Sequence, residues 1–256
     1  MPSRSPLKVP PLRNPGQSLD EEIERLRNGT AMAYVLFAAA FCLLAFMEWY
    51  GYWFHTPRYP LWFTGGAVIA AVIAFFKVKG LRAQLRALRL GRDGERFVGQ
   101  KLEELRSMGA HVLHDIPGDG FNIDHVVVSD RGIFAIETKT CSKKSSESRV
   151  TFSGEQILID GHRPDRDPIK QARAESKWLG ELLQKSTGKR FPVRAVVLFP
   201  NWWVEPAPES IRRHVWVLEP KAFAVFFRNE PTRLPPDLVT MAALHLSTHV
   251  HSKAVE

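Results

Sequence analysis

The stretch NIDHVVVSDRGIFAIETKT, residues 122–140, contains the pattern that decides how this chain folds. Two apolar runs rich in β-branched residues flank the short polar turn SDRG, which predicts a β-hairpin. Charged residues nevertheless occur at one end of both strands, Asp124 in the first and Glu137 and Lys139 in the second. The pattern therefore predicts a largely buried hairpin with a charged cluster at one end.

The turn decides how these charges lie relative to one another. If the loop is the two-residue DR of SDRG, the numbers of paired residues add up to 261. Asp124 then lies opposite Glu137, and both share a face with Lys139, because strand side chains alternate. His125 points to the other face and is expected to be structural. A three-residue loop that uses Gly132 would shift this register by one and would need a bulge to restore it.

Two opposed carboxylates need a compensating partner, since such residues have Cβ atoms about 4.5–5.5 Å apart and like charges there repel. A proton shared between the two carboxyl groups is one solution. A divalent cation with oxygen ligands, Mg²⁺ or Mn²⁺, is a second. A purely structural ion pair with Lys139 is a third. The residues of the hairpin leave these alternatives open.

The composition of the whole chain indicates which class of partner it binds. The chain has 256 residues, enough for one or two domains, with 35 Lys and Arg against 27 Asp and Glu, a net charge of +8 and a pI near 9.7. This balance favours anionic partners, either nucleic acid or lipid headgroups. The chain has two cysteines, Cys42 and Cys141, so neither a disulfide framework nor a thiolate zinc site is indicated.

Two segments near the N-terminus, residues 30–47 and 61–76, contain no charged residue. Both approach the length of about 17–25 residues that spans a bilayer, and flanking aromatic residues extend them. The connecting sequence EWYGYWFHTPRYP is rich in Trp and Tyr, as is typical of a membrane–water interface. A buried helix pair of a soluble protein is the alternative. The aromatic belt favours a transmembrane hairpin over residues 30–78, with spans at about 30–50 and 60–77.

Basic residues set the expected orientation of this hairpin. Six of them lie from Lys77 to Arg92 and others precede the first span, whereas the connecting loop contains only Arg58. By the positive-inside rule the chain is a two-pass membrane protein with both termini on the cytoplasmic side. The Pro-rich start predicts a flexible tail and a short helix over residues 1–29. Residues 79–90 predict a basic helix lying along anionic headgroups.

The remaining residues, 91–250, predict one α/β domain on the cytoplasmic side. Helical and strand patterns alternate along it, and the apolar run FPVRAVVLFP is typical of a strand buried on both faces. Asp167 and Pro168 are the expected N-cap and first residue of the preceding helix. The expected fold is a mixed sheet flanked by helices and preceded by the two-helix hairpin.

Three segments together resemble a known family: GRDGERFVGQKLEEL, the quoted hairpin, and DPIKQARAESKWLGELL. In this order and at this spacing they are similar to the nuclease-related domain (NERD) over residues 91–200. That family is placed in the restriction-endonuclease-like PD-(D/E)XK superfamily. The resemblance implies a restriction-endonuclease-like sheet and a nuclease that uses a divalent metal ion.

The resemblance also implies a role for each matching residue. Asp124 and Glu137 would be metal-binding carboxylates, and Glu95 from the first segment would complete the metal ligands or position Lys139. Lys139 would orient the attacking water or stabilise charge on the phosphate, and Gln171 would line the same cleft. The chemistry agrees, because carboxylate oxygens suit Mg²⁺ or Mn²⁺ and a cation stabilises the negative charge that develops on a phosphate.

These observations support a leading hypothesis and two alternatives. The leading one is a membrane-anchored, metal-dependent nuclease that hydrolyses nucleic-acid phosphodiester bonds, with DNA preferred. The second is a non-catalytic nucleic-acid-binding or partner-docking module on the membrane, with Glu95 only a surface charge and Gln171 only a partner of a strand end. A transporter-associated subunit is the weakest, because two spans without an internal charge make a poor pathway. No residue pattern identifies a protein partner or a preferred base sequence.

Overall fold

The computed structural model describes residues 12–54, 59–143, 145, 147–208 and 215–253. The chain divides into two compact units. One comprises Leu19–Leu90, and the other joins the residues up to Ser18 with Gly91–Glu256. The long helix α3 contributes residues to both units.

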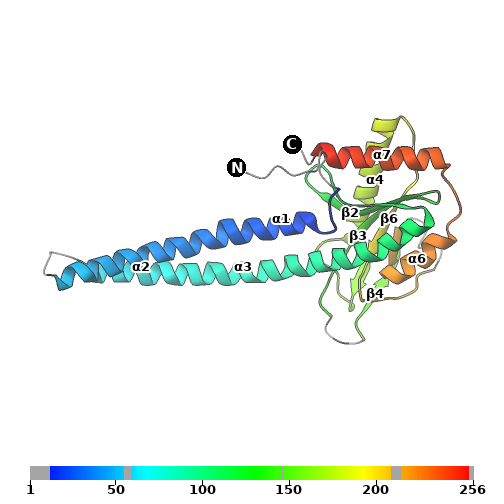
Figure 1. The fold of residues 1–256 in the computed structure, drawn as a ribbon. Coiled ribbons are helices and arrows are strands. Elements are labelled where there is room, and N and C mark those ends of the chain that lie inside the picture. Colours follow the sequence, from blue (N-terminus) through cyan, green and yellow to red (C-terminus); the bar gives the residue numbers. More distant parts are fainter. Residues whose placement is uncertain (1–11, 55–58, 144, 146, 209–214, 254–256) are drawn as a thin grey trace. The chain divides into compact units, whose positions relative to one another are not determined.

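The unit Leu19–Leu90 is helical. Its elements are α1 (Gln17–Arg25), the π-helical turn η1 (Leu26–Ala31), α2 (Met32–Trp53) and the first part of α3 (Pro60–Glu103). α2 and this part of α3 run side by side (Figure 1), and the Trp49 indole donates to the Thr64 hydroxyl at 2.8 Å. Gly66 permits close packing here, because a Cβ at that position would lie 3.4 Å from the Phe41 ring.

Two helical stretches, Gln17–Trp53 and Pro60–Met108, are long and apolar enough to cross a membrane, judged by length and composition. Their most apolar windows have mean hydropathies of 2.2 and 1.9, yet only 6% and 11% of those windows is buried. Phe46 and Ile69, for example, are 67% and 63% exposed. Exposing apolar area to water costs about 25 cal/mol per Å², so this outer surface is poorly suited to water.

Helix α3 is longer than any helix that the sequence patterns predict. It runs over Pro60–Glu103, through the second apolar run, the basic segment and the first helix of the α/β domain. Pro60 stands at its first position, where proline is tolerated, and no other proline follows before Pro117. The 3₁₀ turn η2 (Glu104–Met108) then ends at Gly109, whose φ of 81° reverses the chain.

The α/β domain is built on a five-stranded sheet of order β1-β2-β3-β6-β8. Its strands are β1 (His111–Pro117), β2 (Asn122–Ser129), β3 (Gly132–Thr138), β6 (Val193–Leu198) and β8 (Val215–Leu218). The first three pair antiparallel, and β3, β6 and β8 pair parallel, so the predicted mixed sheet is confirmed. A separate three-stranded sheet consists of β5 (Ile157–Ile159), β4 (Arg149–Phe152) and β7 (Trp203–Val204).

Helices cover both faces of the large sheet (Figure 1). They are α4 (Pro168–Thr187), α6 (Pro220–Asn229), α7 (Pro236–Lys253) and the end of α3. On the face covered by α4 and α7, Leu179 packs in one core with Ala135. On the face covered by α3 and α6, Phe223 packs in another core with Phe134. β3 is buried along its whole length, because its side chains alternate between these two cores.

The N-terminus of α4 has the predicted cap. The Asp167 side chain accepts hydrogen bonds from the backbone N–H groups of Ile169 and Lys170, and Pro168 is the first helical residue. These bonds satisfy donors that the first turn of a helix leaves unpaired. The cap therefore marks where α4 begins.

Candidate functional site

The charged end of the hairpin lies just beyond the last paired residues of β2 and β3. Pairing extends to His125↔Ile136, and partner numbers add up to 261, so the predicted register is confirmed. Asp124 directly precedes His125 in β2, and its Oδ2 accepts a hydrogen bond from the backbone N–H of Thr138 at 2.6 Å. By strand alternation, Asp124 and Glu137 fall on the face of the sheet that α4 covers.

Four side chains form a polar ring on that face. The Lys139 ammonium contacts Glu137 Oε1 at 2.6 Å and donates to Gln171 Oε1 at 2.9 Å. The Gln171 amide donates to Glu175 Oε1 at 2.9 Å, and the carboxyl groups of Glu175 and Glu137 are within hydrogen-bonding contact. Gln171 and Glu175 are one turn apart on α4 and so share a face of that helix. The ring joins three residues singled out from the sequence to one, Glu175, that was not.

Glu95 approaches this cluster from α3. It is 8% exposed, and its carboxylate accepts a hydrogen bond from the backbone N–H of Gly16. The adjacent Gly94 explains how the helix comes so close, since a Cβ there would lie 1.9 Å from the Thr140 hydroxyl. A side chain at position 94 would push the helix away from the chain that follows β3.

The carboxyl groups of the cluster perturb one another. Burial raises the pKa of Glu95 to about 8, and the charges of Asp115 and Glu137 add to that shift. Burial also raises the pKa of Glu175 to about 9, again assisted by Glu137. The pKa of Asp124 lies well above its usual value because of lost hydration and the nearby carboxylates of Glu137 and Glu95. Such a cluster favours bound protons or a bound cation.

Asp115 is a further carboxylate near the site that no sequence motif marks. Asp115 lies within β1 in the left-handed region, with a φ of 51°. Neither Asp115 nor Asp124 on the adjacent strand is among the paired residues of β1 and β2. The buried Asp115 carboxylate accepts three hydrogen bonds, from Arg13 Nε at 2.7 Å, Ser18 N at 2.9 Å and Asn122 Nδ2 at 3.0 Å. Such bonds stabilise an aspartate that burial would otherwise disfavour.

These contacts change the view of the N-terminal segment. A flexible tail is expected for the Pro-rich start; residues 1–11 lie outside the described residues, whereas Arg13–Ser18 pack on the α/β domain. Gly99 of α3 allows this packing, because a Cβ there would lie 2.6 Å from the Pro15 ring. The segment is held by an ion pair with Asp115 and a backbone hydrogen bond to Glu95.

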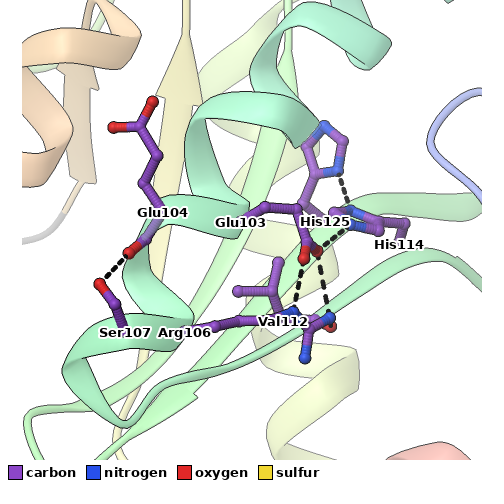
Figure 2. A network of polar contacts seen from close by, with 7 residues as sticks. All are labelled: Glu103, Glu104, Arg106, Ser107, Val112, His114 and His125. Carbon is purple, nitrogen blue, oxygen red and sulfur yellow. Dashed lines mark hydrogen bonds and ion pairs between the residues drawn. The ribbon is translucent and has the colours of Figure 1, made fainter.

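The opposite face of β2 carries a separate polar network (Figure 2). His125 is fully buried there, and its Nδ1 lies 2.9 Å from His114 Nδ1. His114 Nε2 lies 2.9 Å from a Glu103 carboxylate oxygen, and Arg106 contacts the same carboxylate at 2.6 Å. Burial lowers the pKa of both histidines. His125 therefore ties β2 to the end of α3, a structural role that agrees with its position opposite Asp124.

The donor atoms of the acidic cluster suit a divalent cation. Two buried oxygens, Glu137 Oε2 and Glu175 Oε2, have no hydrogen-bond partner among the described residues. Mg²⁺ and Mn²⁺ prefer such oxygen ligands. Within the described part of the chain, however, no group of three or more His, Cys, Asp or Glu side chains is arranged to hold a metal ion. Lys139 and the Thr138 N–H engage one oxygen of each carboxyl group, Glu137 Oε1 and Asp124 Oδ2.

Sequence reasoning missed Glu175 and Asp115 for different reasons. Glu175 lies four residues after Gln171, a spacing that places both on one helical face, so this signal was present. Asp115 lies inside an apolar strand, and its partner Arg13 is 102 residues away in the chain. No local pattern connects residues at that separation.

Known proteins resemble this chain in the region of the site. The family model for the nuclease-related domain matches residues 90–200. An uncharacterized protein of Bacillus anthracis is 37% identical over 54 residues, which is 19% of this chain and 26% of that protein. No solved structure matches the chain significantly. The matched region contains the end of α3 that carries Glu95, the charged hairpin and α4, so residues 90–200 are similar to the nuclease-related domain family.

Proposed function

We propose that this protein is a membrane-anchored nuclease that uses Mg²⁺ or Mn²⁺ to hydrolyse phosphodiester bonds of nucleic acid, with DNA preferred over RNA. The match of residues 90–200 to the nuclease-related domain supports the reaction class. One observation carries the proposal, namely that four elements bring together Glu95, Asp124, Glu137, Lys139 and Gln171. An excess of positive charge, +8 for the chain, suits a polyanionic substrate.

Each residue has a distinct task in this proposal. Asp124, Glu137 and Glu95 hold the cation, which supplies Lewis-acid polarisation of the phosphodiester. Their carboxyl groups exchange retained protons for the cation, since metal binding requires ionised ligands. The Lys139 side chain is 24% exposed and held between Glu137 and Gln171, so its ammonium is positioned to stabilise charge on a phosphate or to orient water.

The two apolar helices support the membrane anchor. Their outward apolar side chains gain most from lipid, whose tails replace the water that those side chains would otherwise contact. The basic residues from Lys77 to Arg92 support a cytoplasmic position of the following domain, by the positive-inside rule. Nucleic acid in the cytoplasm is then within reach of the site.

Cleavage by the full-length protein in detergent micelles tests this function. Labelled single-stranded DNA, double-stranded DNA and RNA are incubated with Mg²⁺, Mn²⁺ or a chelator. The expected result is cation-dependent cleavage, fastest on DNA, that falls at least ~100-fold in Asp124→Asn and in Glu137→Gln, since losing a ligand costs more than losing the outer partners that orient one. Asp130→Asn, at the other end of the same hairpin, serves as the matched control.

The outcomes separate the two leading hypotheses. Cleavage that needs the cation and disappears in both site variants, but not in Asp130→Asn, supports the nuclease. Absence of both cleavage and cation binding in the folded wild-type protein contradicts it. A binding module tethered to the membrane would then remain, and retention of DNA by that inactive protein would support this second function.

A further inference from the structure

The contact between Glu175 and Glu137 is the least satisfied polar contact of the cluster. Glu175 and Glu137 are only 2% and 4% exposed. Their Oε1 atoms are bonded, by Gln171 and Lys139 respectively. Their Oε2 atoms are buried and have no partner among the residues that the structure describes. The two carboxyl groups are in hydrogen-bonding contact with each other, so a proton shared between them or a bound cation is what can satisfy the remaining oxygens.

A buried pair of this kind is unfavourable unless something positive lies between the oxygens. Leaving a buried polar atom unpaired costs about 1–3 kcal/mol, and more when it is charged. The neighbouring cation of the chain, Lys139, contacts Glu137 Oε1 and Gln171 Oε1, so these contacts leave the Oε2 atoms unsatisfied. A small divalent ion satisfies two carboxylate oxygens at once, because it takes six or more oxygen ligands.

We propose that Glu175 of α4 is a further carboxylate ligand of the cation site, binding through Oε2 together with Glu137. This inference rests on the proposed function and extends the site from the sheet and α3 to α4. The polar ring supports this role, because the hydrogen bond from Gln171 engages Glu175 Oε1 and leaves Oε2 without such a bond, while the Glu175 carboxyl group contacts that of Glu137. Glu175 is thereby a group that touches the cation, not only a partner of Gln171.

Isothermal titration of Mn²⁺ into the full-length protein in detergent micelles tests this ligand directly, without relying on activity. We compare the wild type with Glu175→Gln, which keeps the shape and the hydrogen bond to Gln171 but lowers ligand charge. The matched control is Glu181→Gln on the same helix, whose side chain is 66% exposed. We expect Glu175→Gln to weaken Mn²⁺ binding by more than ~100-fold and Glu181→Gln to leave it unchanged, because losing a direct ligand costs more than the ~10–100-fold lost with an outer partner.

Each outcome decides a different claim. Unchanged Mn²⁺ affinity in folded Glu175→Gln, beside wild-type binding that Asp124→Asn abolishes, overturns the Glu175 assignment and leaves the proposed nuclease intact. A wild-type protein that binds no Mn²⁺ overturns both. If Glu175→Gln does not fold, Glu175→Asp replaces it, since the carboxylate is kept but shortened by one methylene. A weaker Mn²⁺ affinity in Glu175→Asp supports direct ligation, and an unchanged affinity contradicts it.

Discussion

The two units of this chain each depart from the usual rule that apolar side chains are buried and charged ones exposed. One unit exposes apolar side chains, and the other buries carboxylates. In Leu19–Leu90, large apolar residues such as Phe46 and Ile69 face outward. In the α/β domain, the carboxylates Glu95, Glu137 and Glu175 are buried. Soluble proteins rarely bury unpaired carboxylates or expose broad apolar surfaces.

Each departure agrees with the partner proposed for that unit. Outward apolar side chains become favourable in lipid, and buried carboxylates become favourable when a cation or protons neutralise them. The difference shows that burial has meaning only relative to the medium that surrounds each unit. This difference also predicts which substitutions should destabilise the α/β domain and which should instead affect the apolar helices.

The largest contrast is expected from the same substitution in both units. Phe134→Ala removes a ring that is 1% exposed and stacks near Trp216 and Phe227, so the α/β domain should lose about 3–5 kcal/mol of unfolding free energy. Phe75→Ala, at a ring 62% exposed on α3, should change that free energy by less than about 0.5 kcal/mol. Pulse proteolysis of both variants across a urea series measures the difference. Equal losses of unfolding free energy in Phe134→Ala and Phe75→Ala would contradict the separation of the chain into two units.

A charge in the apolar helices should have the next largest effect. Ile69→Arg places a guanidinium near the middle of the second apolar run and should make membrane insertion less favourable by about 2.5–3.5 kcal/mol. Alkaline extraction of membranes measures it as a shift of the protein into the soluble fraction. Val225→Arg, at an exposed position of α6 in the α/β domain, is the control and should stay in the membrane fraction. Unchanged extraction of Ile69→Arg would remove the case for the second span.

The smallest expected effect concerns the pH dependence of the cation-free domain. Glu95 has a pKa raised from 4.5 to about 8, so the folded state holds a proton that the unfolded state releases between these values. Stability therefore falls as pH rises from 4.5 towards 8, because the folded state binds more protons there. Glu95→Gln should remove part of this loss, at least about 1.4 kcal/mol at pH 9, the equivalent of one pKa unit.

Urea unfolding of wild type and Glu95→Gln at pH 5 and pH 9, with a chelator present, measures this effect. The two proteins should differ little at pH 5 and most at pH 9, and Mg²⁺ should restore wild-type stability at pH 9. Glu104→Gln, at an exposed carboxylate of η2, retains Glu95 and should therefore keep the pH dependence of the wild type. If Glu95→Gln were less stable than the wild type at pH 9, the ionised Glu95 side chain would not be destabilising the folded domain, and the prediction would be wrong.

Local patterns in the sequence were sufficient for most of the sheet and for part of the site. Of the two registers that the SDRG turn leaves open, the structure has that of the two-residue loop, which places Asp124 beside the end of β3. Asp167 and Pro168 mark the start of α4 through hydrogen bonds made within a few residues. Lys139 was singled out from the charges of the hairpin and Gln171 through a family resemblance, and they lie within hydrogen-bonding distance.

The sequence by itself narrowed the strand register to two and determined the helix cap and the apolar segments, because each depends on periodicity or on bonds between residues close together in the chain. Tertiary structure alone decided that Arg13–Ser18 bind Asp115 and Glu95, and that Glu175 meets Glu137. These contacts depend on how α3 and α4 pack against the sheet. The raised pKa values have the same origin, since a carboxyl group loses water only when distant segments close over it.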